Sequence, residues 1–354
     1  MKNIIINKTI MENALATAVG YLPSKESDSE GMLTINANGV SFSIVTTNHA
    51  ESVVLSELDY LSDELEKPCF SFSIDGKRML HVARSIKAES LKLAITDKEV
   101  TISGGRNKVK LEISDVIFDF IINKQGDSLN IEKLFDGFRS ILHAIDIHNP
   151  KFELSGILLE CQNGVLSLVG TDTRRLSIFT IENVVSPCNI IISKESIKSI
   201  LKLFEGQNAQ AVSTSTDLTI WTESICYQTK LINGTYPQWQ RIIPQKIAKI
   251  FSMDRQKLLE LLKEASIFKP EVEIIIGNEM ISIADLDGNA VTNDSVSTDG
   301  LSMQFNVNSK YIMDFLTSYD GEKIQIGMND PKLPLVLIAN PRYKEIVMPY
   351  CLEE

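Results

Sequence analysis

The sequence has few cysteines and histidines and no long apolar run, and each shortage excludes a class of protein. Only five of its 354 residues are cysteines and none form a C-x-x-C pair, so we expect reduced thiols, not a disulfide framework. No segment approaches the roughly 20 apolar residues of a membrane span. The apolar run in "MKNIIINKTIMENALA" is too short for a signal peptide. We therefore expect a cytoplasmic protein that does not enter the membrane.

The sequence also lacks the short motifs of common catalytic and nucleotide-binding sites. It contains no G-x-x-x-x-G-K-[ST], no G-x-G-x-x-G after a strand, no H-E-x-x-H and no G-x-S-x-G. Its four histidines are not at metal-ligand spacing, and the nearest pair, His143 and His148, straddles a predicted helix end. We expect no catalytic residue, no metal and no cofactor. An enzyme whose site escapes these patterns is an open alternative.

Basic residues are fewer than acidic ones, 35 against 46. The formal net charge is −11, which argues against a protein that binds nucleic acid over its whole surface. The hydrophobic fraction of 44% and the charged fraction of 23% are ordinary for folded domains, so extensive disorder is not expected. A net acidic protein can still confine its cations to one surface.

What the sequence does contain is a threefold repeat. "GMLTINANGVSFSIVTTN" from Gly31 and "GILLECQNGVLSLVGTDT" from Gly156 both alternate apolar and polar residues around an "NGV" turn. This pattern predicts a β-hairpin, because Asn-Gly supplies the positive φ angles of a tight turn. A weaker third copy, "VEIIIGNEMISIADLD", begins at Val272.

Amphipathic helices recur at matching places in the three copies. Asn7, Asn130 and Asp254 are the predicted N-caps of the first helix in each copy, and Ile10 is predicted to face the core. Further hairpins follow the second helices. The six predicted helices span 7–22, 75–86, 130–146, 193–206, 254–268 and 308–321.

Repeated helices and antiparallel hairpins predict an α+β layer fold. The repeat spacing of roughly 120 residues is a typical domain size. We predict three similar domains, 1–122, 123–247 and 248–354, each with two helices packed on antiparallel sheets.

Basic residues recur on the predicted helices, whereas many acids lie in strands and loops. One interpretation is that these are solvated helix faces. The other is that the helices line one positive surface that faces DNA, since screening over about 8–10 Å separates it from distant acids. The candidate DNA-facing residues are Lys77, Arg78, Arg84, Lys87, Arg139, Lys194, Lys198, Lys202, Lys257 and Lys263.

Three motifs carry a resemblance to a known family. They are "GTDTRRLSIFT" (170–180), "LINGTYPQWQRIIP" (231–244) and the terminal "IVMPYCL" (346–352). In this order and within a threefold α+β repeat, they resemble the bacterial β sliding clamp family, the processivity subunit of DNA polymerase III. Thr173 and Arg174 stand where the family pattern has Gly and His, and Glu353 and Glu354 extend the usual terminus.

The resemblance implies a clamp fold in which each chain forms half of a closed ring. Two chains would meet head to tail and encircle duplex DNA without reading its sequence. Domain 1 of one chain would contact domain 3 of the next. The interface positions that match are Val109, Leu111, Ile267 and Phe268.

The resemblance also implies a groove that receives short peptide motifs. Its partners would be the DNA polymerase III alpha subunit, the clamp loader and other clamp-binding proteins. Arginines there would bind peptide carbonyls or an acid. Carried over by position, the groove comprises Leu154, Thr171, Thr173, Arg174, Arg175, Leu176, Pro237, Arg241, Ile242, Asn308, Tyr311, Ile346, Val347, Met348, Pro349, Tyr350 and Leu352.

Two alternatives stay open beside a DNA clamp. The chain could be a peptide-binding scaffold of the same fold that does not encircle DNA. Residues 346–348 could also do no more than complete a sheet, although one strand can both complete a sheet and line a groove.

Overall fold

The computed structural model describes residues 2–23, 31–62, 67–117, 123–184, 186–298 and 300–350. The chain divides into two compact units. Unit 1 contains Met1–Ile131 and Lys202–Lys230, and unit 2 contains Glu132–Leu201 and Leu231–Glu354. Each unit is described below on its own.

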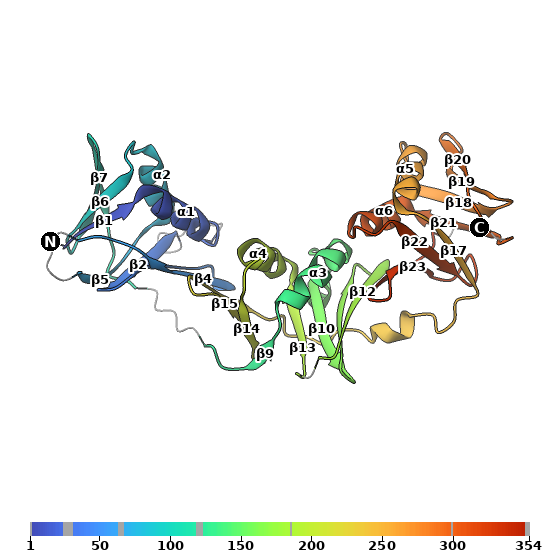
Figure 1. Cartoon of the computed structure of the whole chain (residues 1–354), viewed down its shortest axis with the longest axis horizontal. Helices are drawn as coiled ribbons and strands as arrows, with labels where there is room; N and C mark the ends of the chain where they lie inside the picture. The colour runs from blue at the N-terminus through green and yellow to red at the C-terminus, as the bar shows by residue number, and fades with distance from the viewer. Residues whose placement is uncertain are drawn as a thin grey trace. The chain divides into compact units, whose positions relative to one another are not determined.

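Unit 1 has one eight-stranded and one four-stranded antiparallel sheet (Figure 1). Helices α1 (Lys8–Val19) and α2 (Gly76–Ser85) pack against each other. The four-stranded sheet has the order β1 (Lys2–Asn7), β6 (Ser90–Ile95), β7 (Glu99–Gly104) and β8 (Asn107–Glu112). The eight-stranded sheet has the order β5 (Cys69–Asp75), β2 (Met32–Asn38), β3 (Phe42–Thr47), β4 (Glu51–Leu58), β16 (Ile225–Lys230), β15 (Asp217–Trp221), β14 (Gln210–Ser213) and β9 (Asp127–Leu129).

Unit 2 repeats this plan. Its four-stranded sheet has the order β20 (Val291–Ser295), β19 (Met280–Asp285), β18 (Glu271–Gly277) and β21 (Met303–Asn308). Its eight-stranded sheet has the order β13 (Asn189–Ser193), β10 (Gly156–Gln162), β11 (Val165–Thr171), β12 (Arg175–Glu182), β24 (Tyr343–Val347), β23 (Leu335–Asn340), β22 (Lys323–Met328) and β17 (Lys249–Asp254).

The helices of unit 2 lie against these sheets. Helix α3 (Glu132–Ile141) packs on β11 and β12, and α5 (Arg255–Ala265) packs on α6 (Ser309–Thr317). Helix α4 (Lys194–Phe204) begins in unit 2 and ends in unit 1. Short 3-10 helices η1 (Leu142–Ala144), η2 (Phe152–Ser155) and η3 (Trp239–Ile242) complete the unit.

The predicted α+β class is confirmed, and most of the predicted helix starts are correct. Asn7 and Asp254 accept hydrogen bonds from the N–H groups of Ile10 and Lys257 and are N-caps as predicted. Helix α3 begins at Glu132, two residues after Asn130, and the role of Asn130 as its N-cap stays a prediction.

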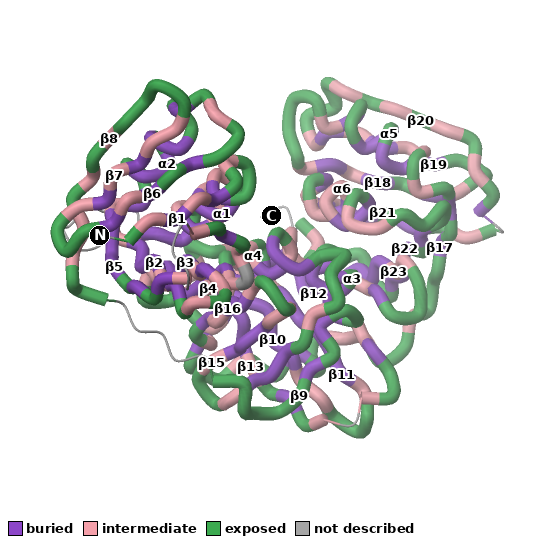
Figure 2. Tube along the Cα trace, turned by 60° about the vertical axis from the view of Figure 1, so that its left-hand side comes forward, coloured by how far each residue is buried: buried purple, intermediate pink, exposed green. Residues whose placement is uncertain are grey.

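The buried stripe of α1 also differs from the prediction. It consists of Met11, Ala14, Leu15 and Ala18, so Ile10 lies beside it and is 41% exposed. Alternating burial along the strands places the apolar cores between helices and sheets, and exposed residues collect at the turns (Figure 2). No helix in the described residues is long and apolar enough to cross a membrane.

Each eight-stranded sheet consists of two four-stranded halves that meet at one pair of strands. The first joint is the pairing of β4 with β16, from Glu51 opposite Thr229 to Leu55 opposite Ile225. The second joint is the pairing of β12 with β24, from Arg175 opposite Val347 to Phe179 opposite Tyr343. Two of the three sequence motifs, 170–180 and 346–352, meet at the second joint.

Candidate functional site

The second joint begins at a tight turn, Thr171 to Arg175. Asp172 Oδ1 accepts the N–H groups of Arg174 and Arg175 at 3.0 and 2.9 Å, and Thr171 Oγ1 accepts the Thr173 N–H at 3.0 Å. These are the side-chain bonds by which Asp and Thr replace ordinary turn bonds. They hold Thr173 at φ +75°, a conformation that β-branched residues rarely adopt.

Arg175 is buried, and its guanidinium is enclosed by partners. Its Nε donates to Asp172 Oδ2 at 3.0 Å, its Nη1 to Asp314 Oδ2 at 2.9 Å and its Nη2 to the His143 carbonyl at 2.8 Å. Burial by itself would lower the pKa of Arg175, but the carboxylates of Glu345, Asp172 and Asp314 raise it overall, so the cation is retained. The sequence suggested that Arg175 binds peptide, whereas the structure directs its charge into the protein.

Behind Arg175 lies a second buried polar group, Glu345. Its Oε2 lies 2.7 Å from His143 Nε2 and accepts a hydrogen bond from Ser177, and its side chain is wholly buried. Burial, and next the Glu345 charge, raise the pKa of Tyr343 well above its usual range. Its hydroxyl therefore stays protonated and donates to the Ser140 carbonyl at 2.6 Å.

The tail after β24 continues along the same turn. The Met348 N–H donates to the Arg174 carbonyl at 2.9 Å, and the Tyr350 N–H donates to the Asn306 carbonyl at 2.8 Å. Ile346 and Val347 are buried in the sheet, whereas Met348 and Tyr350 are 41% and 44% exposed. The terminal segment thus completes a sheet with two residues and offers the next ones to solvent.

The side chains of Arg175 and Glu345 lie on one face of the sheet at this joint. The other face is covered by residues 231–247, which we call the connector. Ile232 and Trp239 of the connector pack in one apolar cluster with Leu176 and Ile346, and Tyr236 lies against it. Trp239 Nε1 and Gln240 Nε2 both donate to Glu160 Oε2, at 3.1 and 2.9 Å. The connector therefore binds to the sheet through its aromatic residues.

The structure brings most of the predicted groove residues together. The tail bonds to the turn at Arg174, and the Arg175 guanidinium of the turn lies over the Tyr311 ring of α6. Asn308 caps the start of the same helix. Pro237, Arg241 and Ile242 lie exposed on the connector, and Leu154 lies buried in η2. Leu176 and Ile346 are buried core residues, 3% and 1% exposed, and pack against the connector. Leu352 lies outside the described residues.

Sequence reasoning missed the residues that support this site. Asp314, His143 and Glu345 surround Arg175 and Ser177, yet none belongs to a recognised motif position. Trp239 could have been identified from the sequence, since it lies inside the motif "LINGTYPQWQRIIP".

The candidate DNA-facing residues fall into two groups. Arg78, Arg84, Arg139 and Lys257 form ion pairs with acids on or beside their own helices. Lys194 is half-buried and donates to the Ile145 carbonyl at 2.7 Å; burial, then Lys198 and Arg175, lowers its pKa. Exposed positions are held by Lys77, Lys87, Lys198, Lys202 and Lys263.

The four candidate interface residues lie in two places, on the edge strand β8 and in the turn between α5 and β18. Val109 and Leu111 are half-buried in β8, the edge strand of its sheet. Ile267 and Phe268 follow α5, and they are 70% and 66% exposed. Apolar side chains this exposed commonly mark a contact surface when they are adjacent.

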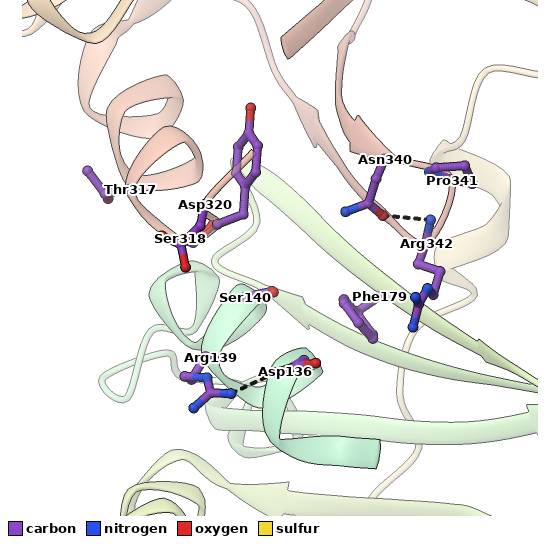
Figure 3. Close-up of a pocket in the computed structure, with 11 residues that line it drawn as sticks. Asp136, Arg139, Ser140, Phe179, Thr317, Ser318, Asp320, Asn340, Pro341 and Arg342 are labelled. Carbon is purple, nitrogen blue, oxygen red and sulfur yellow. Dashed lines mark hydrogen bonds and ion pairs between the residues drawn. The ribbon is translucent and has the colours of Figure 1, made fainter. Parts of the chain in front are cut away.

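A cavity of about 980 Å³ lies elsewhere in unit 2 (Figure 3). Its lining comes from α3, the end of α6 and the turn at Asn340–Arg342, and includes an Asp136–Arg139 ion pair of 2.7 Å. Arg139 is the one candidate residue among its described lining residues, so this cavity is separate from the predicted groove.

Comparisons with known proteins point to one family. Residues 128–238 match the family model of the DNA polymerase III beta subunit, central domain, and residues 240–351 match that of its C-terminal domain. A beta sliding clamp of Helicobacter pylori is 24% identical, over 94% of this chain and 93% of its own length.

Solved structures show the same fold. The Helicobacter pylori beta clamp bound to a DNA ligase peptide has a TM-score of 0.89 at 23% identity, over 99% of this chain and all of that one. The DNA polymerase III subunit beta of Pseudomonas aeruginosa has a TM-score of 0.89 at 18% identity, with the same coverage of each chain.

Proposed function

Since the chain belongs to the DNA polymerase III beta subunit family, the bacterial beta sliding clamps, we propose that two copies close head to tail into a ring around duplex DNA. The resemblance predicted from the motifs is thereby confirmed. The chain is a processivity factor and not an enzyme. In the proposed ring it tethers the DNA polymerase III alpha subunit, and a cytoplasmic location follows because bacterial replication takes place there.

The main support for a ring is the arrangement of the four-stranded halves of the sheets. Strands β4, β12 and β20 end three equivalent halves, and β8, β16 and β24 end three others. Within the chain β4 pairs with β16 and β12 pairs with β24, which leaves β20 and β8 as unmatched ends. Unpaired sheet edges favour association with another chain. Pairing β20 of one copy with β8 of the next would make a third eight-stranded sheet by the same rule.

This contact is heterologous, since different surfaces meet, and such contacts close into rings when their rotation permits. Ile267 and Phe268 would supply its apolar centre, with Val109 and Leu111 on the facing strand. The proposed domains, 1–122, 123–247 and 248–354, make the pairing domain 3 to domain 1. The family-model matches at 128–238 and 240–351 support the last two ranges.

The exposed lysines on the helices would contact DNA phosphates. Phosphate contacts position a protein on DNA without reading sequence, which a sliding ring requires. Lys87, Lys198, Lys202 and Lys263 are the best candidates, because they are exposed and no ion pair engages them among the described residues. Lys194 contributes less, because its ammonium group is bound to a carbonyl inside unit 2.

The groove at the second joint is the proposed docking site for clamp-binding motifs. The clamp loader and other replication and repair proteins would share it with the polymerase. Met348 suits several partners, because a flexible thioether adapts its shape to different apolar side chains. Arg174 and Arg241 are exposed and free to meet a peptide carbonyl or acid, unlike Arg175.

The ring is tested by replacing its apolar contact. Ile267→Ser with Phe268→Ser should convert a dimer of twice 39.5 kDa into monomers in sedimentation at micromolar concentration. The same variant, loaded by its clamp loader, should lose retention on nicked circular DNA. Val40→Ser is the matched control, since Val40 is 73% exposed and lies at a hairpin turn outside the proposed contact.

Wild-type protein should stay on circular DNA and slide off linear DNA. Equal retention on both forms would contradict encirclement and favour a peptide-binding scaffold of the same fold. A wild-type monomer at micromolar concentration would contradict the proposed pairing of β20 with β8.

A further inference from the structure

Two residues of helix α6 contact the guanidinium of Arg175. Asp314 on α6 accepts its Nη1 at 2.9 Å, and the Tyr311 ring centroid lies 4.8 Å from its Cζ. Residues three apart on a helix project from the same face, so Tyr311 and Asp314 reach the guanidinium together. A charge 6% exposed is stable in this position only because partners surround it.

The same guanidinium also fixes the turn. Asp172 bonds Arg175 Nε through Oδ2 and bonds two backbone N–H groups of the turn through Oδ1. The carbonyl of Arg174, in the middle of that turn, accepts the N–H of Met348. A continuous chain of contacts therefore runs from Asp314 through Arg175 and Asp172 to Met348 in the tail.

We propose that Asp314 is a positioning residue for the groove, which fixes the Arg175 guanidinium and thereby the Tyr311 ring and the 171–175 turn. This inference rests on the proposed peptide groove. Asp314 itself does not contact the peptide. It acts on affinity by keeping two walls of the groove in the conformation that binds.

Electrostatics explain why an ionised acid is required at this place. Asp172 alone would leave the Nη1 edge of a buried cation unpaired, and a buried charge that loses a partner is strongly disfavoured. The isosteric amide of Asp314→Asn would keep the shape of the side chain and remove the negative charge. Arg175 would then be expected to leave the Tyr311 face, and the turn would lose its anchor.

The experiment measures the affinity of a short synthetic peptide containing Gln and Leu, by calorimetry on the full chain. Asp314→Asn should weaken binding roughly five- to tenfold, which is the size of effect seen when a residue important for an interface is replaced. Asp320→Asn is the matched control, because it removes the same charge just beyond α6 at an exposed position, and it should bind as wild type. Asp314→Glu, which keeps the charge, should recover most of the affinity.

A second background separates positioning from general stability. In Tyr311→Leu protein the guanidinium has lost the ring that it orients and positions only the 171–175 turn. Asp314→Asn should therefore weaken binding by a smaller factor than it does in the wild-type background. An equal loss in both backgrounds would overturn the proposal, because it would indicate a general structural defect.

Met348→Ala separates this inference from the groove itself. If Met348→Ala weakens the peptide and Asp314→Asn does not, the groove stands and the positioning role is overturned. If the peptide does not bind wild type, or binds Met348→Ala unchanged, the proposed groove is overturned and the role of Asp314 with it.

Discussion

The two joints of the chain contain turns with the same hydrogen bonds, but the side chains around the two turns differ. In the first joint Thr47 Oγ1 and Asn48 Oδ1 accept the N–H groups of His49, Ala50 and Glu51, and the Lys230 N–H donates to the Ala50 carbonyl. In the second joint the equivalent bonds join 171–175 to Met348. His49 and Thr173 even share a positive φ, 72° and 75°.

The side chains differ where the backbones agree. At the position of Arg175 the first joint has Glu51, which accepts the Tyr227 hydroxyl at 2.6 Å. At the position of Glu345 it has that neutral tyrosine. The first joint therefore needs no buried cation. Its second strand, β16, continues into the connector at residue 231. Buried charge and an exposed tail distinguish the joint that we propose to bind peptides from the one that only connects.

The largest difference is expected from the two glutamates. Glu345→Ala should lower the free energy of unfolding by about 3 kcal/mol, because it removes one member of a buried charged network. Glu51→Ala should lower it less, by about 1–2 kcal/mol, because the side chain of Glu51 accepts hydrogen bonds from Tyr227 and Asn48. Urea denaturation followed by circular dichroism measures both. Equal losses would show that the second joint is not specialised electrostatically.

Sequence patterns were sufficient for the hairpins and most helix starts, and the family resemblance indicated the segments that meet at the second joint. They were not sufficient for the partners of Arg175, because Asp314 and His143 are 139 and 32 residues away in the chain. Neither local periodicity nor a short motif carries such pairings. For the same reason the motif placed Arg175 among the residues expected to bind a peptide. Only the fold shows that its guanidinium points into the protein and is paired there.

The same limit applies to Leu176. Its motif position indicates a groove residue, but the connector covers it. Trimming it to alanine would create a cavity and destabilise the fold by about 2–5 kcal/mol, so it cannot test binding cleanly. Met348, 41% exposed, can.

A smaller effect should come from the strained residue of each turn. Thr173→Gly should stabilise the protein by about 1 kcal/mol, because glycine adopts positive φ without a steric penalty. His49→Gly should change stability by a few tenths of a kcal/mol at most, since histidine tolerates this region better and glycine adds freedom to the unfolded chain. Thermal unfolding of both variants measures the difference. A larger gain at His49 would contradict the view that the β-branched residue carries the strain.

The smallest effect concerns the thiol at the first joint. Cys226 lies opposite Val54 in that joint, and burial raises its pKa to about 11, although Lys124 opposes the shift. An acid whose pKa is higher in the folded state stabilises the fold fully at low pH and loses that contribution as the pH rises above its unfolded pKa. The first joint should therefore weaken above about pH 9, whereas the second joint has no cysteine among its paired residues.

Only the thiolate reacts with alkylating reagents, so Cys226 should be protected at pH 8. Exposed Cys69 should react with iodoacetamide at least about tenfold faster in peptide mapping by mass spectrometry. Cys226→Ala should show less loss of stability than wild type between pH 8 and pH 10, and the Cys69→Ala control should follow wild type. If Cys226 is alkylated as fast as Cys69 in the native protein, the first joint opens readily. The contrast between a plain connecting joint and a specialised one would then have to rest on the buried charges of the second joint alone.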